Sequence, residues 1–403
     1  MPIAATSPRP GIYIDGVLHA SLSQDLLGFT IEDAVSSPAR CLARFANVGG
    51  NGNQASGYKY FALDDFDFGR LLTVWQGVPP ATLVRLFEGR IVLIEGVYAA
   101  AGAPEVLVQA EDRLWDLRMT RRTRVFEHMS DADMMQSVAA DHGLHASVHL
   151  NGSQSTHAHT AQLHQSDYAF LFDRVTAAGA QMWIEQNTLM VTDAAQPGDP
   201  AELVYGDGLV HFRVRADVRR QATVSGVTGW DVYGKQAIGV SASDDDLPST
   251  DMDASSGGRT LEAAFGHKCH AIVDAVPASE DEAASLAVAY HRQQSAEFII
   301  GHGVAVGAPA LRAGRAIDLQ GLGPLFSGGY HITRVRHLFD PEHGLRAEFD
   351  VRRARLGATV HDSKPRETAH ANRDPRRAED SGSRHREASK SPRRGTGRRT
   401  KGA

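Results

Sequence analysis

Six histidines stand close together in the middle of the chain, and imidazole is the side chain that most often binds metal ions in proteins. They are His142, His145, His149, His157, His159 and His164. His157 and His159 would project from the same face of a strand, because side chains alternate along an extended backbone. No spacing among the six matches a zinc signature, and we expect no acidic partners at suitable positions. We interpret them as surface or loop histidines.

Two other segments carry side chains that bind metals. His267, Cys269 and His270 offer two or three ligands, but the second ligand pair of a structural zinc site is missing. Aspartates gather at 244–246, with Asp251 and Asp253 close by, yet the glycine and the twelfth-position glutamate of an EF-hand loop are absent. The segment Asp244–Gly258 is therefore predicted to be an exposed acidic loop without calcium.

Sequence signatures of enzymes are also absent. The chain has no G-x-S-x-G elbow, no P-loop and no Rossmann G-x-G-x-x-G, and the glycines from Gly301 to Gly307 have the wrong spacing and follow a predicted helix. A peptidoglycan hydrolase needs a placed carboxylate or a metal-binding His/Asp set, and neither can be assigned. We predict no catalytic residue, no cofactor-binding residue, no metal ligand and no cofactor. We interpret three tryptophans, Trp115, Trp183 and Trp230, as residues that anchor the core and not as aromatic surfaces on which sugars stack.

The elements of the first part are predicted to be strands. Asp15-Gly16 separates Gly11–Ile14 from Val17–Leu22, and Glu88-Gly89 separates Val84–Phe87 from Arg90–Tyr98. An acidic residue followed by glycine between two apolar runs is typical of a tight hairpin turn. Val106–Ala110 continues the β pattern, and the glycine- and asparagine-rich stretch 47–57 is predicted to be a loop.

The middle of the chain alternates helices and strands. Ser130 precedes an acidic variant of a capping box and an apolar helical face, and Gly143 is the predicted stop. A second helix is expected after Ser166, because apolar residues recur at helical spacing up to Gly179. A hairpin over 182–192 should follow.

The third part returns to strands. Alternating polar and apolar residues predict half-buried strands at 210–215 and 222–231, and a long hairpin over 331–351 with its turn at 340–344. A capping box at Ser279–Glu282 predicts a helix that runs to about Ala296.

Charge divides the chain into two unlike parts. From His361 onward there are 13 basic and 6 acidic side chains, whereas the whole chain has a net charge of −6, so residues 1–360 carry −13. The stretch after about Gly357 has almost no large apolar residues and is predicted to be disordered. We interpret it as a flexible or docking extension; nucleic-acid binding through it is the less favoured interpretation.

Composition limits the class of protein. The chain has 403 residues, of which 42% are hydrophobic, which allows two to four packed units. No apolar run is long enough for a membrane span, and the N-terminus lacks the pattern of a secretory signal, so no stable membrane insertion is expected. Cys41 and Cys269 stand too far apart for a metal-type pair, which suits assembly in a reducing bacterial cytoplasm.

Four segments, in their order along the chain, resemble the phage late control protein D family, the tail hubs of contractile phages, and the hub portion of VgrG spike proteins. They contain TRVFEHMSDADMMQSVAADHGL, QSDYAFLFDRVTAAGAQMW, GWDVYGKQAI and GAPALRAGRAIDLQGLGPLFSGGYHITRVRHLFD, and lie at Arg121–Leu144, Gln165–Trp183, Phe212–Ile238 and Gly307–Arg353. The order and spacing of the four segments carry the resemblance. No needle-like segment follows the last of them, so we expect the spike tip to be a separate chain.

The resemblance implies a mainly β fold with an inserted α/β segment and two related β-barrel hub domains. The expected boundaries are 1–120 for the first barrel domain, 121–205 for the α/β middle domain, 206–357 for the second barrel domain with a helical insertion, and 358–403 for the basic tail. Three subunits would form the hub of a contractile phage tail or a phage-tail-like injection system. The implied partners are two further copies of the chain, the inner tail tube protein, the spike or tip protein, other baseplate proteins, and a tape measure or effector cargo.

Two alternatives stay open at this point. A tail-associated cell-wall hydrolase would show a pair of carboxylates about 5–9 Å apart in a cleft. A cargo-loading adaptor would need residues 361–403 to load an effector but not to assemble the particle.

Overall fold

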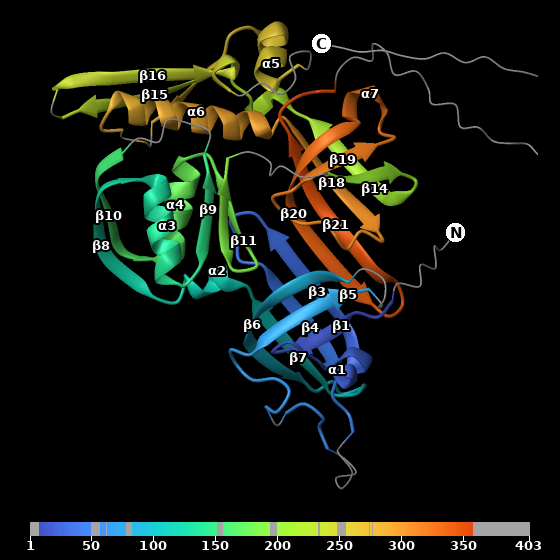
Figure 1. The fold of residues 1–403 in the computed structure, drawn as a ribbon. Coiled ribbons are helices and arrows are strands. Elements are labelled where there is room, and N and C mark those ends of the chain that lie inside the picture. Colours follow the sequence, from blue (N-terminus) through green and yellow to red (C-terminus); the bar gives the residue numbers. More distant parts are fainter. Residues whose placement is uncertain are drawn as a thin grey trace, which may run out of the picture. The chain divides into compact units, whose positions relative to one another are not determined.

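A computed structural model describes residues 8–49, 57–61, 63–77, 83–150, 156–193, 200–232, 234–247, 255–273, 275 and 277–357. The predicted disordered tail, Asp251, Asp253 and most of the predicted loop 47–57 lie outside these residues. The chain divides into two units, Met1–His361 and Asp362–Ala403, and all described elements belong to the first. Strands dominate, and helices gather in the middle and in a later insertion (Figure 1).

The first elements form an antiparallel set of strands. Their order in the sheet is β3-β4-β7-β6-β5-β1-β2. Apolar side chains alternate along β4 and β7, so one face of each strand enters the core. The elements are β1 (Gly11–Ile14), β2 (Val17–Leu18), α1 (Ala20–Asp25), β3 (Leu26–Ala34), β4 (Arg40–Ala46), β5 (Leu71–Gln76), β6 (Val84–Val97) and β7 (Glu105–Glu111).

The last elements close a six-stranded barrel in the order β19-β13-β14-β18-β21-β20, because β20 also pairs with β19. Phe298, Ile317, Val335 and Phe349 lie in its buried core. The mainly β fold with an inserted α/β segment is thereby confirmed. The elements are β13 (Ala201–Tyr205), β14 (Gly208–Ala216), β18 (Ile299–Val306), β19 (Ala316–Gln320), α7 (Gly323–Phe326), β20 (Gly328–Asp340) and β21 (Gly344–Arg353).

Strands β3 and β20 join the N-terminal strands and the barrel into one continuous sheet. A Cβ on Gly28 would lie 2.7 Å from the carbonyl oxygen of Phe339, so a glycine at this position lets the two strands approach. Phe29 stacks on Phe339 with ring centroids 5.6 Å apart, and Phe339 and Leu345 belong to the core of the N-terminal strands. The final hairpin therefore stabilises both ends of the described fold.

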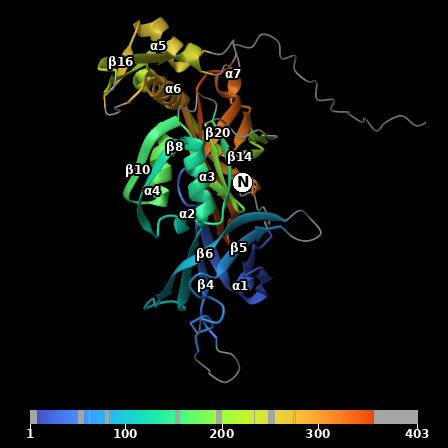
Figure 2. The ribbon, with the colours of Figure 1, turned by 60° about the vertical axis from the view of Figure 1, so that its left-hand side comes forward.

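Between these strands lies the predicted α/β segment, visible in both ribbon views (Figures 1 and 2). Ser130 and Asp133 form the predicted capping box at the start of α3, and Gly143 and Gly179 follow α3 and α4 with φ of +65°. Both predicted helices and the predicted hairpin are confirmed. The elements are α2 (Arg113–Asp116), β8 (Arg121–Ser130), α3 (Asp131–Asp141), β9 (His145–His149), β10 (Thr156–Ser166), α4 (Asp167–Ala177), β11 (Gln181–Glu185) and β12 (Thr188–Thr192).

An insertion between β14 and β18 has its own small core, in which α6 packs on a three-stranded sheet in the order β16-β15-β17. Ser279 caps α6 by accepting from the N–H of Glu282, as the sequence predicts. The elements are β15 (Val224–Asp231), β16 (Gln236–Ser243), α5 (Gly257–Phe265), β17 (Cys269–Ile272) and α6 (Glu280–Ala296), with short 3-10 turns at Val218–Arg220 and Asp244–Asp246.

Three local predictions are wrong. Glu88-Gly89 is no turn: β6 runs through it, because a Cβ on Gly89 would lie 2.4 Å from the carbonyl oxygen of Glu111, so the glycine serves the close approach of β7. The strand predicted over Val17–Leu22 ends at Leu18, where α1 soon begins. Trp230 is no core anchor, since 52% of its surface is exposed.

No helix among the described residues is long and apolar enough to cross a membrane.

Candidate functional site

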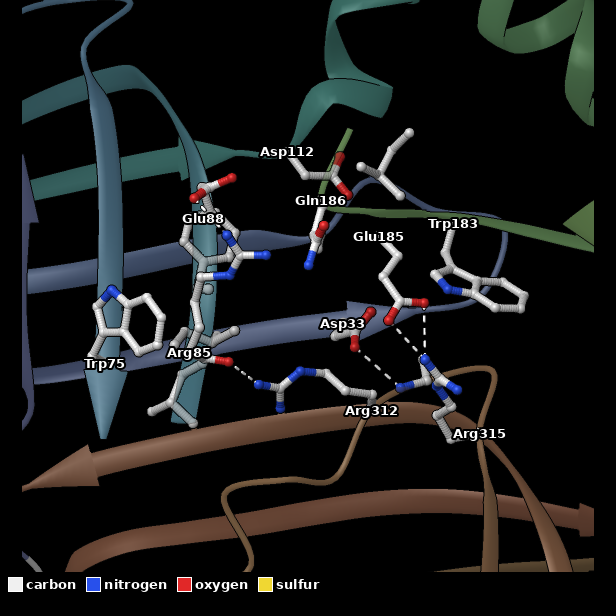
Figure 3. A pocket seen from close by; sticks show the side chains of 16 residues that line it. Asp33, Trp75, Arg85, Glu88, Asp112, Trp183, Glu185, Gln186, Arg312 and Arg315 are labelled. Atoms are coloured by element: carbon white, nitrogen blue, oxygen red, sulfur yellow. Dashed lines mark hydrogen bonds and ion pairs between the residues drawn. The ribbon is translucent and has the colours of Figure 1, made fainter. Parts of the chain in front are cut away.

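A cavity of about 460 Å³ lies where the N-terminal strands, the middle segment and the barrel meet (Figure 3). Charged side chains from all three parts line it. Asp33, Arg85 and Glu88 come from β3 and β6, Asp112 precedes α2, Glu185 ends β11, and Arg312 and Arg315 lie just before β19. Because the sequence places these residues in separate elements, only the fold brings them together.

Two carboxyl groups in the cavity have raised pKa values. Burial raises the pKa of Asp33, and it raises the pKa of Asp112 to about 7. Both carboxylates nevertheless have structural partners: Asp33 accepts from the backbone N–H of Ala313 at 3.1 Å, and Asp112 caps α2 by accepting from the N–H of Leu114 at 3.0 Å. A raised pKa in a cleft suggests an acid catalyst, but these hydrogen bonds explain why the two residues are there.

The remaining charges of the cavity are also paired. Glu88 accepts from Arg85 at 2.7 Å, and Glu185 accepts from Arg315 at 2.7 Å. Arg312 donates to the carbonyl oxygens of Pro309, Leu311 and Arg85, as Figure 3 shows for the last of these. A glycosidase needs one carboxyl as acid and a second as nucleophile or base, yet each of the four acids of the cavity already has a partner. The charges of this junction cavity therefore connect the three parts of the chain to one another.

Hydrogen bonds around the cavity connect the three parts directly. The N–H of Ser36 donates to the carbonyl oxygen of Met182 at 2.6 Å, and Ser36 Oγ accepts from the N–H of Met182 at 3.2 Å. Tyr168 donates to the carbonyl oxygen of Ser36 at 2.8 Å. His331 Nε2, in the barrel, lies 2.8 Å from Gln181 Oε1. Such bonds fix the relative placement of the middle segment, the first strands and the barrel.

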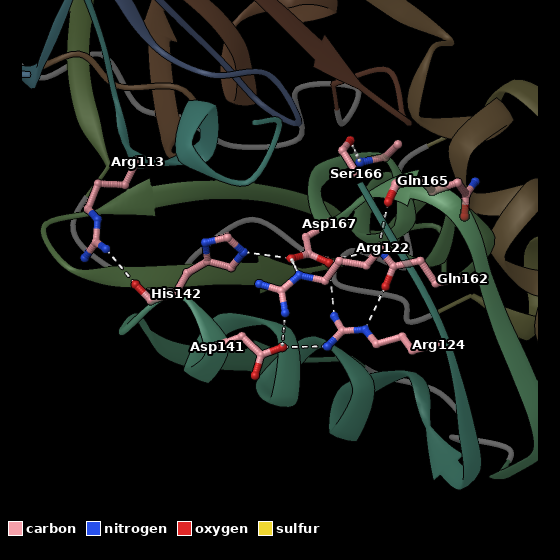
Figure 4. A network of polar contacts seen from close by, with 10 residues as sticks. Arg113, Arg122, Arg124, Asp141, His142, Gln162, Gln165, Ser166 and Asp167 are labelled. Atoms are coloured by element: carbon pink, nitrogen blue, oxygen red, sulfur yellow. Dashed lines mark hydrogen bonds and ion pairs between the residues drawn. The ribbon is translucent and has the colours of Figure 1, made fainter. Parts of the chain in front are cut away.

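A second polar centre lies inside the middle segment, around the fully buried Asp167 at the start of α4 (Figure 4). Its carboxylate is contacted by Gln162 at 2.9 Å, His142 at 2.8 Å, Arg124 at 3.1 Å and Arg122 at 3.0 Å. Burial opposes ionisation, but the hydrogen bonds from Gln162 and His142 and the two guanidinium charges outweigh it and lower the pKa of Asp167. This centre ties the strands β8 and β10 to both helices.

A serine, a histidine and an aspartate form a chain of contacts within the insertion. Ser225 Oγ lies 3.0 Å from His291 Nδ1, and His291 Nε2 lies 3.1 Å from Asp244 Oδ1. The same residue types catalyse acyl transfer in hydrolases. Ser225 and His291, however, have no exposed surface, and Ser225 lines none of the cavities described for this part of the chain. The chain of contacts is a buried structural network.

The sequence gives no sign of this network, because its three residues are far apart along the chain and share no motif. The prediction of an exposed acidic loop is wrong for Asp244, which is buried. Its pKa is lowered, since hydrogen bonds from His291 and Ser256 outweigh the opposing effect of burial. One of these partners, Ser256, lies within the predicted loop, and the other, His291, lies on α6.

The six central histidines do not converge. His142 belongs to the Asp167 centre, and His157 lies 3.4 Å from Asp131 and 3.8 Å from Glu282. His142 and His157 therefore each have an acidic partner that their sequence spacing does not indicate, and the contact with Asp131 raises the pKa of His157. Within the described residues, no group of three or more His, Cys, Asp or Glu side chains could hold a metal ion.

The side chains of His267, Cys269 and His270 are also dispersed, as the missing second ligand pair leads one to expect. His267 Nδ1 lies 3.1 Å from Thr223 Oγ1, and His270 Nδ1 lies 3.1 Å from Gln294 Nε2. Cys269 is exposed on β17. The two histidines therefore have separate local partners.

Comparisons with known proteins found one family model and several similar solved structures. A family model described as the Alg8 N-terminal domain matches residues 67–340, which is more than half of the chain. No protein with a curated description matches the sequence. The 43 kDa tail protein of prophage MuSo2 from Shewanella oneidensis is similar in structure, with a TM-score of 0.62, 14% identity, and coverage of 86% of this chain and 98% of that one.

Two further solved structures are similar. A tail protein of Neisseria meningitidis MC58 has a TM-score of 0.56 at 11% identity and covers 85% of this chain and 96% of its own. An Escherichia coli protein described as a component of the type VI secretion system, similar to bacteriophage T4 tail proteins, has a TM-score of 0.51 at 13% identity and covers 84% and 76%. The chain thus has the fold found in phage tail proteins and in this secretion component, as the four sequence segments predict.

Proposed function

We propose that this chain, which belongs to the Alg8 N-terminal domain family, is a non-enzymatic structural hub subunit of a contractile phage tail or of a related injection system. The observation that carries the proposal is the fold match over 98% of a phage tail protein. The arrangement of charges supports it, because the acids of the junction cavity and the buried Asp167 are engaged in holding the parts of the chain together. The family description names a domain and states no activity.

The partners belong to the same proposal. Three copies would form a ring, which would adapt the hexameric inner tube to a trimeric spike made by a separate chain. Other baseplate proteins and a tape measure or effector cargo would contact the ring. The protein would assemble in the bacterial cytoplasm and become part of the particle. We keep the division into two hub barrel domains, an α/β domain and a basic tail as part of this proposal.

The mass of the full chain in solution tests the ring. Light scattering and native mass spectrometry over a range of concentrations should give a species of about three times 43.5 kDa. Large permanent interfaces of this kind gain their affinity from buried apolar surface, so the trimer should persist on dilution and at raised salt. A monomer at every concentration would contradict a self-sufficient ring, and an assay on cell-wall fragments would then test the hydrolase alternative.

A further inference from the structure

Four arginines gather around a groove of about 660 Å³ on the barrel. Arg213 and Arg215 lie on β14, Arg220 lies in the following 3-10 turn, and Arg352 lies on β21. The strand register brings them together: Arg215 pairs with Ile300 of β18, and Ile300 pairs with Arg352. Positive charge from three elements is thereby concentrated on one side of the barrel.

These four arginines differ from their neighbours in having no partner. Among the described residues, no hydrogen bond or ion pair joins any of the four to another side chain. By contrast, other arginines of the barrel are paired with acids: Arg334 with Asp350 at 2.7 Å, Arg336 with Glu348 at 2.8 Å, and Arg346 with Asp340 at 2.7 Å. Arg213, Arg215 and Arg220 are exposed, so their guanidinium groups can bind a partner from outside the chain, and Arg352 is half-buried. Burial lowers the pKa of Arg352.

We propose that this arginine groove binds a carboxylate-bearing loop of a second copy of the chain, and so forms part of the ring contact. Arginine suits such a role because its planar fork binds carboxylates with two hydrogen bonds. Val35 and Ile300 also line the groove, so the bound segment needs apolar as well as acidic side chains. The inference rests on the proposed function, since it names the surface by which the ring would close.

Charge favours a protein segment over nucleic acid. Residues 1–360 carry a net charge of −13, which repels a long polyanion. Glu297 and Asp350 stand among the arginines of the groove and would oppose a continuous phosphate backbone. A short segment with a few carboxylates avoids both penalties, because it can place its charges only where the guanidinium groups lie.

The loop Leu63–Phe68 has the required composition. Its sequence is LDDFDF, and Leu63 and Phe68 expose 51% and 61% of their surfaces. Asp64 and Asp67 are also exposed, and Leu63 has φ of +61°, a conformation that leucine rarely adopts. The loop belongs to the N-terminal strands and the groove to the barrel. A contact between two different surfaces of identical chains is heterologous, and such contacts form a ring when the rotation from one copy to the next closes.

Charge exchange in the full chain tests the proposal. Arg213→Glu with Arg215→Glu, and separately Asp64→Lys with Asp67→Lys, should each weaken trimer formation at least about tenfold, because each opposes like charges across the contact. The chain with all four substitutions should recover the trimer. Lys235→Glu with Arg90→Glu, a matched change of two exposed cations outside the groove, should leave the mass unchanged. Circular dichroism should show that every variant is folded.

The outcomes separate this inference from the proposed function. A trimer that survives both double substitutions, or a failure of the fourfold variant to recover although it is folded, overturns the loop–groove contact and leaves the hub role intact. Binding of duplex DNA by the wild-type chain, lost with Arg213→Glu and Arg215→Glu, would overturn it in favour of a nucleic-acid surface. A wild-type monomer overturns it as well, and the hub role is then decided by the location of the chain in the particle.

Discussion

The carboxylate of Asp167 lies 2.8 Å from Nε2 of His142, and this contact links the end of one helix to the start of the next inside the middle segment. Arg122 and Arg124 reach the same carboxylate from β8. One fully buried charge therefore holds two helices and a strand in place. If this carboxylate were removed, the guanidinium groups of Arg122 and Arg124 would lose their shared acidic partner. The loss of one side of a buried ionic contact lowers the stability of a protein strongly.

Asp167→Asn should lower the free energy of unfolding by about 3–5 kcal/mol, because it breaks a buried ionic centre from one side only. Urea unfolding followed by circular dichroism measures the change. Asp207→Asn, in an exposed turn, removes the same charge and should change stability by less than about 0.5 kcal/mol. Equal effects of the two substitutions would contradict the structural role of Asp167.

The contacts of Ser225, His291 and Asp244 should have no catalytic consequence. A fluorophosphonate probe, which labels activated serines, should not label the native chain, because Ser225 is buried. Ser225→Ala should instead cost about 1–3 kcal/mol of stability, since it leaves the buried His291 without one of its partners. Labelling of the native chain that Ser225→Ala abolishes would restore the hydrolase alternative.

Two buried histidines, His331 and His337, should make the fold sensitive to acid. Burial lowers the pKa of His331 to about 4 and that of His337 to about 3, both below the value near 6.5 expected in the unfolded chain. At these two sites the unfolded state therefore binds more protons below pH 6.5, and each histidine should lower stability by about 1.4 kcal/mol per pH unit as pH decreases toward 4. Asp33 and Asp112 act in the opposite direction, because their raised pKa values let the folded chain bind protons that the unfolded chain binds only at lower pH. Urea midpoints between pH 7 and pH 4.5 measure this.

His331→Gln separates the contribution of one histidine. The amide can still bond to Gln181, but it does not titrate. The variant should lose less stability than the wild type between pH 7 and pH 4.5. An unchanged pH dependence would show that His331 is not kept neutral by the fold. The lowered pKa of Asp167 adds a further loss at lower pH, when its carboxylate is protonated.

Gly89→Ala should destabilise the N-terminal strands by about 1–3 kcal/mol, because the added methyl group would lie 2.4 Å from the carbonyl oxygen of Glu111. Gly239→Ala, on β16, is the matched control, since a Cβ there would meet no atom within 4 Å. Thermal unfolding of the two variants compares them. Alanine also lowers the entropy of the unfolded chain, which by itself raises stability. A Gly89→Ala variant no less stable than Gly239→Ala would therefore contradict the close approach of β7 to Gly89.

The sequence predicts those elements whose signals are local. Three helices begin at serines that cap them: Ser130, Ser166 and Ser279. Each serine side chain accepts a hydrogen bond from the backbone N–H three residues later, which is a local signal. Alternating apolar residues announce the final hairpin. Glu88-Gly89 misleads for a physical reason: glycine serves tight turns and close strand contacts equally well, and only the position of β7 distinguishes the two.

The candidate sites could not be predicted in the same way. Asp33, Asp112 and Arg312 share a cavity only because β3 pairs with β20 and the segment before β19 folds back over them. Asp244 lies within an acidic run that is typical of a solvated loop. In the structure it is buried, and its carboxylate has His291 and Ser256 as hydrogen-bond partners. Contacts between residues this far apart depend on tertiary structure, which no local spacing encodes.

The location and copy number of the chain in an assembled particle test the hub most directly. Tail-like particles purified from the encoding bacterium should be examined by electron cryomicroscopy and by quantitative mass spectrometry of their subunits. For a hub subunit we expect three copies per particle, in one three-fold ring where the inner tube meets the spike. Absence of the chain from the particles, or its repetition along the tube, would contradict the hub role.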